Sequence, residues 1–426
     1  MNAAIALSLG ILFIFGVPIA ISIGLASVIG ISFFSSLPLL VVPQRMFAGL
    51  DSFPLMAIPL FILAGNLMSA GGISKRLVEL AKSLVGGIQG GLACSCVLTC
   101  MIFAAVSGSS VATTFAIGAI LIPAMVRHGY PVSLAASIQA SSAELGVLIP
   151  PSIPLILYGV STDTSIGQLF IAGIGPGLLI GGSLIIFLYL YCKVKGYGKN
   201  DGDDRQSIDK AMVSALPALS VPFVVLGGIY GGVFTPTEAS AVAVFCALVV
   251  GFLVYRELKF ADLYGIFRHS VISTTAVMLI ISAAALFSFL ISRSGLPTEV
   301  ATWVTSVFET KITFLLAVNV MLLFIGMFIE TSAAILVLAP IFAPIAIAYG
   351  IDPVHFGLII VVNLALGMFT PPLGVNLFAA CAVAKISIDE IVKSLGWFVG
   401  VVLACLMAIT YIPWISLFLR DLLYGF

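Results

Sequence analysis

Residues 145–152 read LGVLIPPS, and residues 366–374 read LGMFTPPLG. The second stretch begins 221 positions after the first, and the same shift aligns further residues along the chain. The aligned pairs are Phe103 and Phe324, Ala112 and Ala333, Ile120 and Ile341, Pro123 and Pro344, Gly129 and Gly350, Leu145 and Leu366, Gly146 and Gly367, Pro150 and Pro371, and Pro151 and Pro372. Proline and glycine restrict or free the backbone as no other residues do, so their recurrence at one offset indicates a shared backbone geometry. The chain is therefore predicted to be an internal duplication.

The composition is that of a membrane protein. Of the 426 residues, 61% are hydrophobic and 8% are charged, and the mean hydropathy is +1.25. Soluble domains have about a quarter of their residues charged. Lipid offers the backbone no hydrogen-bond partners, so a spanning chain forms helices or a closed barrel, and the alternation of a barrel is absent here. We expect an all-α polytopic protein of the bacterial inner membrane, and the net charge of zero argues against nucleic acid as a partner.

Several uncharged stretches are long enough to cross a bilayer, which takes about 20 apolar residues. Single spans are predicted at, among others, 4–35, 270–292 and 397–419. Two segments that mix charged and apolar residues, 256–268 and 385–395, are predicted to be separate helices at the membrane surface.

The duplication divides the chain into two repeats. The predicted units are a first repeat at 1–192, a cytoplasmic linker at 193–210 and a second repeat at 211–426. Each repeat is predicted to contain a re-entrant helical hairpin, at about 90–126 and 312–348, and a broken transmembrane helix, at about 132–158 and 356–384. The hairpin arms are only about 15–18 residues long, which is short for a full crossing.

The loops indicate that the two repeats have opposite orientations. The linker 193–210 carries five Lys or Arg residues, which places it in the cytoplasm by the positive-inside rule. Counting spans backwards from the linker puts the loop 127–130 inside, and counting forwards puts the equivalent loop 349–352 outside. The repeat is therefore predicted to be inverted.

Each predicted hairpin turns at small polar residues, which are Ser107-Gly108-Ser109-Ser110 in the first repeat and Glu330-Thr331-Ser332 in the second. A proline pair inside a helix frees backbone carbonyls, and these oxygens together with hydroxyl groups suit a small hard cation. The N-termini of half-helices suit an anionic group. Broken helices at corresponding positions of inverted repeats indicate the binding site of a transporter.

Simpler explanations exist for each motif. A proline pair can be a plain kink, and serine and glycine clusters can permit close helix packing. The recurrence of both motifs at one offset favours a site. An ionisable group at membrane depth is usually functional, which applies to Glu330, whereas Glu144 could serve the site or partner a backbone donor. Ser107, Ser152, Glu330 and Asn376 are expected to converge on the solute.

These motifs resemble those of the large membrane subunit, the M or DctM-type subunit, of tripartite ATP-independent periplasmic (TRAP) transporters. The similar stretches cover nearly the whole chain: GLDSFPL at 49–55, IPLF at 58–61, SGSSVAT at 107–113, IPPS at 149–152, PTEA at 236–239 and TPPLGVN at 370–376. In the overall pattern of these motifs, the chain is most similar to sialic-acid TRAP permeases.

The resemblance implies features that residue spacing alone does not give. It implies sodium-coupled uptake, an elevator-type motion, a small four-helix membrane subunit on a separate chain and a periplasmic substrate-binding protein. It also implies two Na⁺ sites with the solute between the hairpin tips. The first Na⁺ site maps onto Ser107, Ser109, Ser110, Gly146 and Pro150, and the second maps onto Gly326, Thr331, Gly367 and Thr370.

We therefore predict sodium-coupled import of an acidic solute, either a sialic acid or another carboxylate. The alternative within transport is a stand-alone dicarboxylate or oxyanion symporter that needs no binding protein. An intramembrane enzyme would require a His-Glu-x-x-His motif, a Ser–His dyad or paired aspartates within the membrane, and the sequence shows none. A channel is disfavoured because the chain has paired candidate sites and no polar stripe along a pore.

Overall fold

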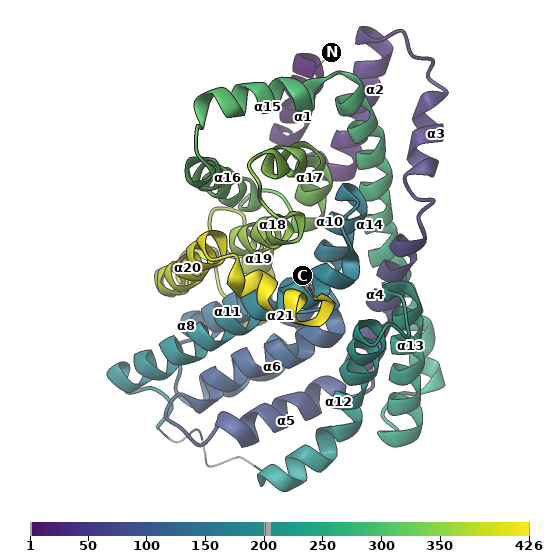
Figure 1. Ribbon diagram of the computed structural model, residues 1–426. Helices are drawn as coiled ribbons and strands as arrows, with labels where there is room; N and C mark the ends of the chain where they lie inside the picture. The colour runs from purple at the N-terminus through teal and green to yellow at the C-terminus, as the bar shows by residue number, and fades with distance from the viewer. Residues whose placement is uncertain (1, 200, 202–205, 426) are drawn as a thin grey trace.

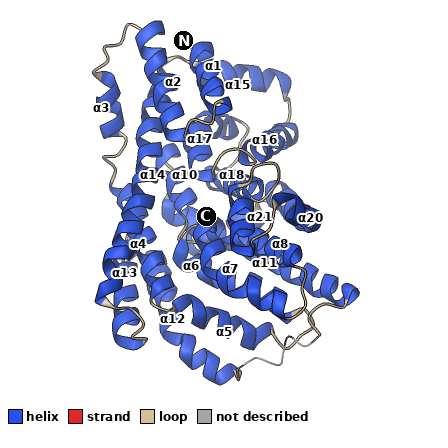
Figure 2. Cartoon of the chain, turned by 180° about the vertical axis from the view of Figure 1, so that it is seen from behind, coloured by secondary structure: helices blue, strands red, loops and turns tan. Residues whose placement is uncertain are grey.

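The computed structural model describes residues 2–199, 201 and 206–425 (Figure 1). Throughout these ranges the regular structure is helical, and no strand occurs in them (Figure 2). The elements are α1 (Asn2–Ile14), α2 (Ile19–Phe34), α3 (Val41–Ala48), η1 (Phe53–Met56), α4 (Ala57–Ala70), α5 (Ile73–Val85), α6 (Gly91–Ser107), α7 (Ser110–Arg127), α8 (Val132–Ala143), α9 (Leu145–Leu148), α10 (Ile153–Thr162), α11 (Ile166–Lys195), α12 (Ile208–Tyr230), α13 (Pro236–Val249), η2 (Val250–Val254), α14 (Phe260–Arg293), α15 (Leu296–Val307), α16 (Lys311–Gly326), α17 (Thr331–Ala348), α18 (Pro353–Met368), α19 (Val375–Ala384), α20 (Ile388–Tyr411) and α21 (Trp414–Tyr424).

Eight helices of the described chain are long and apolar enough to cross a membrane, or up to ten if each bent helix pair counts as one span. One bent pair is the first predicted broken helix, where α8 and α9 meet α10 at an angle of 41°. The predicted all-α polytopic membrane fold with broken spans is therefore confirmed.

The N-terminal prediction of a single span at 4–35 is wrong. The chain turns between α1 and α2, where Gly16 has a φ of +71° and Pro18 precedes the new helix. Glycine adopts this left-handed conformation without strain, and proline has no N–H to continue a helical ladder. The two short helices pack side by side and bury Ile5 and Ile23 against α14.

Two further boundaries differ from the prediction for local reasons. The segments 256–268 and 270–292 join in α14, a helix of 34 residues and about 51 Å that runs along one side of the molecule (Figure 1). Neither glycine nor proline separates them, so the helix continues. Likewise 385–395 belongs largely to α20, whereas the predicted span 397–419 is interrupted at Pro413, after which α21 begins.

The two hairpins and the two broken helices have matching boundaries. Helices α7 and α17 begin 221 residues apart, at Ser110 and Thr331, and α8 and α18 begin 221 residues apart, at Val132 and Pro353. In each repeat the two hairpin arms pack against each other, α6 on α7 and α16 on α17. The helix boundaries thus follow the offset that the prolines and glycines show in the sequence.

Equivalent loops lie at opposite ends of the fold. The first broken helix starts at Val132 and ends at Thr162, so these two residues are far apart. The hydroxyl of Tyr158, near the second of these ends, donates to the carbonyl of Pro353 at 2.8 Å. The loop 349–352 therefore lies opposite the loop 128–131, as an inverted repeat requires. The limits of the repeats and of the linker 193–210 stay a prediction, and residues 200 and 202–205 of that linker lie outside the described chain.

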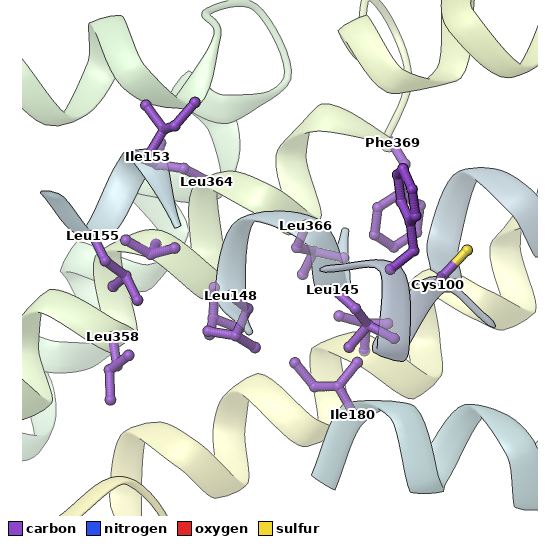
Figure 3. Close-up of a cluster of buried hydrophobic side chains, with 14 of the residues drawn as sticks. Cys100, Leu145, Leu148, Ile153, Leu155, Ile180, Leu358, Leu364, Leu366 and Phe369 are labelled. Atoms are coloured by element: carbon purple, nitrogen blue, oxygen red, sulfur yellow. The ribbon is translucent and has the colours of Figure 1, made fainter. Parts of the chain in front are cut away.

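The core of the molecule is formed where the two broken helices meet. Figure 3 shows side chains of the first broken helix, such as Leu145 and Leu148, close to Leu364, Leu366 and Phe369 of the second. All five are buried. Since lipid is as apolar as these side chains, close packing rather than water exclusion holds helices together in a membrane. This core fixes where the two breaks lie relative to the hairpin tips.

Candidate functional site

The first hairpin tip lies directly on the first helix break. Gly108 has a φ of +62°, which lets the chain turn sharply between α6 and α7. Its carbonyl accepts a hydrogen bond from the backbone N–H of Ile153 at 3.3 Å, and a Cβ on Gly108 would lie 2.8 Å from the carbonyl oxygen of Pro151. The predicted pairing of hairpin tip and break is thus a backbone-to-backbone contact.

Oxygen atoms gather where this tip meets Gly146. A Cβ on Gly146 would lie 2.9 Å from the carbonyl oxygen of Ser109 and 2.8 Å from the hydroxyl of Thr113. The Thr113 hydroxyl donates to that same carbonyl at 2.8 Å and lies 2.9 Å from the hydroxyl of Ser107. Thr113 was missed by sequence reasoning, although it belongs to the quoted SGSSVAT motif. The cluster therefore holds three of the predicted Na⁺ ligands, Ser107, Ser109 and Gly146.

The other two residues predicted for the first Na⁺ site, Ser110 and Pro150, lie at the edges of this oxygen cluster. The hydroxyl of Ser110 points to the sulfur of Met368 at 3.9 Å, which is across the boundary between the repeats. Pro150 is buried inside the break, where the carbonyl that faces the tip is that of Pro151.

The second tip lies on the second break in the same manner. A Cβ on Gly326 would lie 3.0 Å from the carbonyl oxygen of Leu364 and 3.2 Å from the Cα of Gly367. The Thr331 hydroxyl contacts the Met368 sulfur at 2.8 Å. The Thr370 hydroxyl donates to the carbonyl of Leu366 at 2.6 Å, so it is used within the break.

A cavity of about 760 Å³ lies between the two hairpin tips. Ser107 and Ser109 of the first tip and Glu330 and Ser332 of the second line it, and so does Met368. Met368 was missed, although it occupies the repeat position of Val147, which also lines the cavity. The structure therefore brings both predicted tips to one space.

Ser152 and Asn376, two of the four polar residues expected to converge on the solute, are fully buried and do not line this cavity. The Ser152 hydroxyl donates to the carbonyl of Val147 and accepts from the N–H of Leu155, so it caps α10 and closes the break. Capping hydroxyls have this role at many helix starts, and the sequence alone does not separate it from ligand binding.

Asn376 instead joins the two repeats. Its amide nitrogen donates to a carboxylate oxygen of Glu144 at 2.7 Å and to the carbonyl of Ala140 at 3.1 Å. Its amide oxygen accepts from the Thr114 hydroxyl at 2.5 Å. Glu144, for which the sequence left two roles open, is 5% exposed and does not reach the cavity. It therefore partners a side-chain amide in the core.

Glu330 keeps its carboxylate at the edge of the cavity. The side chain caps α17, accepting from the N–H groups of Ser332 and Ala333 at 2.9 and 3.2 Å and from the Ser332 hydroxyl at 2.8 Å. A carboxylate is stabilised at the positive end of a helix. This geometry orders the second tip and leaves Glu330 partly exposed.

The remaining wall of the cavity comes from helices outside the hairpins. Helix α4 contributes Asn66 and Ser69, and α14 contributes His269 and Ser273. The two helices are joined by a hydrogen bond of 2.8 Å from the Asn66 amide to the Ser270 hydroxyl. Sequence reasoning missed these residues because neither helix carries the repeated motifs. The signal in the sequence that could have pointed to these four residues is that they are polar and stand in otherwise apolar stretches.

Comparisons with known proteins agree with this architecture. A family described as the tripartite ATP-independent periplasmic transporter, DctM component, matches residues 6–415. The chain is 46% identical to the isethionate TRAP transporter permease protein DctMQ of Oleidesulfovibrio alaskensis, over 95% of this chain and 64% of that protein. It is 43% identical to the C4-dicarboxylate TRAP transporter large permease protein DctM of Pseudomonas aeruginosa, over 94% of each chain.

A more distant relative and a solved structure extend the comparison. The chain is 35% identical to the sialic acid TRAP transporter large permease protein SiaM of Vibrio cholerae, over 98% of each chain. The crystal structure of the YdaH transporter of Alcanivorax borkumensis has a TM-score of 0.67 over 90% of each chain, and at 17% identity this likeness concerns the fold alone. The family match covers nearly the entire chain, and the chain belongs to the DctM component family of tripartite ATP-independent periplasmic transporters, whose members are transport permeases and not enzymes.

Proposed function

We propose that this chain is the large membrane subunit of a sodium-coupled importer of a small organic acid. The observation that carries the proposal is the shared cavity, in which the two hairpin tips of a DctM-family chain face each other. The relatives named above are a transporter of isethionate, one of C4-dicarboxylates and one of sialic acid, and each of these solutes is an organic acid.

The relatives named above differ in the acid for which they are named. Sialic acid is one candidate, but the relatives named for isethionate and C4-dicarboxylates share 46% and 43% of their aligned residues with this chain, against 35% for the sialic acid permease. The proposal therefore names the class of small organic acids, and sialic acid is one probe among three.

Two Na⁺ ions would be held where each tip meets its break. Ser107, Ser109, Ser110, Gly146 and Pro150 would hold the first ion, and Gly326, Thr331, Gly367 and Thr370 the second. Both sets offer hydroxyl and carbonyl oxygens, and in the described residues no group of three His, Cys, Asp or Glu could hold a metal ion. Uncharged hard oxygens suit a monovalent cation better than Mg²⁺ or Ca²⁺, which prefer carboxylates.

The proposed partners are a small four-helix membrane subunit and a periplasmic substrate-binding protein, each on its own chain. The chain covers 64% of the DctMQ relative and 94% of the protein named a large permease protein. An elevator motion would carry the hairpins past α4. Helix α4 packs against α6, the first arm of the first hairpin, with Gly65 next to Ser107.

Uptake into proteoliposomes tests the proposal. Vesicles with this chain and its small subunit are given radiolabelled isethionate, succinate or sialic acid, with and without the binding protein and an inward Na⁺ gradient. We expect uptake of one acid that requires both. Equal uptake when K⁺ replaces Na⁺, at clamped voltage and pH, would refute sodium coupling. Full uptake without the binding protein would instead support a stand-alone symporter.

A further inference from the structure

The cavity wall contains few groups that can meet a negative charge. Among the residues that line it, only Glu330 and His269 are titratable. Glu330 is an acid, and its oxygens already accept three hydrogen bonds from the start of α17. Among the described residues that line the cavity, His269 is therefore the one basic side chain.

His269 is placed to do so. It lies on α14, one turn before Ser273, which also lines the cavity, and its side chain is exposed. Within the described parts of the chain it forms no hydrogen bond and no ion pair. Asn66, which faces it from α4, uses its amide nitrogen on the neighbouring Ser270. Ser107 and Met368 lie deeper and are buried, so His269 belongs to the outer part of the cavity.

We propose that His269 is a solute-binding residue, whose ring N–H donates a hydrogen bond to the carboxylate or sulfonate of the transported acid. The proposal rests on the proposed function and adds a contact outside the two repeats' hairpins. Hydrogen bonds between a charged group and a donor are about twice as strong as neutral ones. Helix α4 has no charged residue that could compete, and the nearest acid on the cavity wall is Glu330.

The position of His269 has a consequence for the transport cycle. The hairpin tips would carry the solute, whereas α14, which packs along α2 and α4, would belong to the part past which the hairpins move. A contact between the solute and α14 would then exist in only one of the two states. A ligand shifts an equilibrium only through a difference in affinity for the two states. His269 would therefore favour the state in which the tips lie beside α14.

The test compares His269→Leu, which removes both ring nitrogens, with two other variants. Arg268→Gln is the matched control, because it removes a cation one residue away that does not line the cavity. His269→Arg keeps a charged donor in place. Each variant is purified with the small subunit, and binding of radiolabelled isethionate, succinate and sialic acid is measured in saturating Na⁺, followed by the Na⁺ concentration that gives half-maximal binding.

We expect His269→Leu to weaken binding of the acid about fivefold or more, because it loses a partly solvated hydrogen bond to a charged acceptor. His269→Arg and Arg268→Gln should stay within about twofold of the wild type, and the Na⁺ requirement should not change. Unchanged binding in His269→Leu, or an equal loss in Arg268→Gln, would overturn the contact while leaving the proposed function intact. A wild-type protein that binds none of the three acids would overturn both.

Discussion

Gly326 at the end of α16 and Gly367 near the end of α18 lie back to back, so that a Cβ on Gly367 would lie 2.9 Å from the carbonyl oxygen of Gly326. Their backbones approach more closely than any side chain would allow. The contact joins the second hairpin to the second broken helix, and it lies at the second proposed Na⁺ site.

Gly367→Ala is expected to separate these two elements. Overpacking of a tight contact costs about 1–3 kcal/mol, and the displacement would disturb the carbonyl oxygens proposed to bind Na⁺. Uptake should fall at least tenfold and the melting temperature in detergent should drop. Gly182→Ala is the control, because a Cβ there meets nothing within 4 Å. Wild-type uptake in Gly367→Ala would show that the contact has no role in transport.

Gly146→Ala should act on the first proposed Na⁺ site. The added methyl group would press on the Ser109 carbonyl and the Thr113 hydroxyl, which lie 2.9 and 2.8 Å from the Cβ position. We expect the Na⁺ concentration for half-maximal uptake to rise about fivefold or more, because oxygen ligands are displaced. An unchanged Na⁺ dependence, measured at saturating solute, would remove Gly146 from the site.

Ser107→Ala and Ser152→Ala should separate binding from structure. Ser107 lines the cavity, so its loss should raise the half-saturating solute or Na⁺ concentration about fivefold. Ser152 caps α10, and its loss should lower stability by about 1 kcal/mol while half-saturation stays as in the wild type. The measurements are uptake kinetics and thermal unfolding of each purified variant. A solute-affinity defect in Ser152→Ala would contradict the capping role.

Glu330→Ala should impair uptake far more than Glu238→Ala. Both glutamates order the start of a helix, α17 and α13 respectively, but only Glu330 lines the cavity. Its removal would leave three donors of the second tip without their acceptor, and we expect at least a tenfold loss of uptake. Comparable activity of the two variants would show that the Glu330 carboxylate serves only as a cap.

Cysteine labelling should place the loops of the two repeats on opposite faces of the membrane. In Gly129→Cys the thiol should react with an impermeant maleimide from the cytoplasm, and in Gly350→Cys from the periplasm. A Cβ meets nothing within 4 Å at either glycine, but their φ angles of +84° and +69° strain any other residue, so only variants that keep wild-type uptake are labelled. Six of the seven native cysteines are buried, and Cys246 is replaced in the test background. Labelling of both loops from one face would refute the inverted topology.

Much of the architecture was predictable because its signals are local. Proline pairs break helices and glycines permit turns wherever they occur, so the hairpin at 91–127 and the break after Leu148 could be located from the chain itself. The failures were local too. The run 4–35 looked like one span because hydropathy does not register that Gly16 and Pro18 end a helix.

The membrane environment, the duplication, the helix breaks and the hairpin tips could be predicted from the chain, since they depend on its composition and on the backbone preferences of neighbouring residues. Which side chains surround the cavity follows from the packing of the entire fold. Asn376 donates a hydrogen bond to Glu144 in the core, whereas His269 lines the cavity from a helix that carries no repeated motif. The direction of a side chain depends on the rotation of its helix against distant neighbours. That rotation is set by packing over the entire fold, which no single stretch of sequence contains.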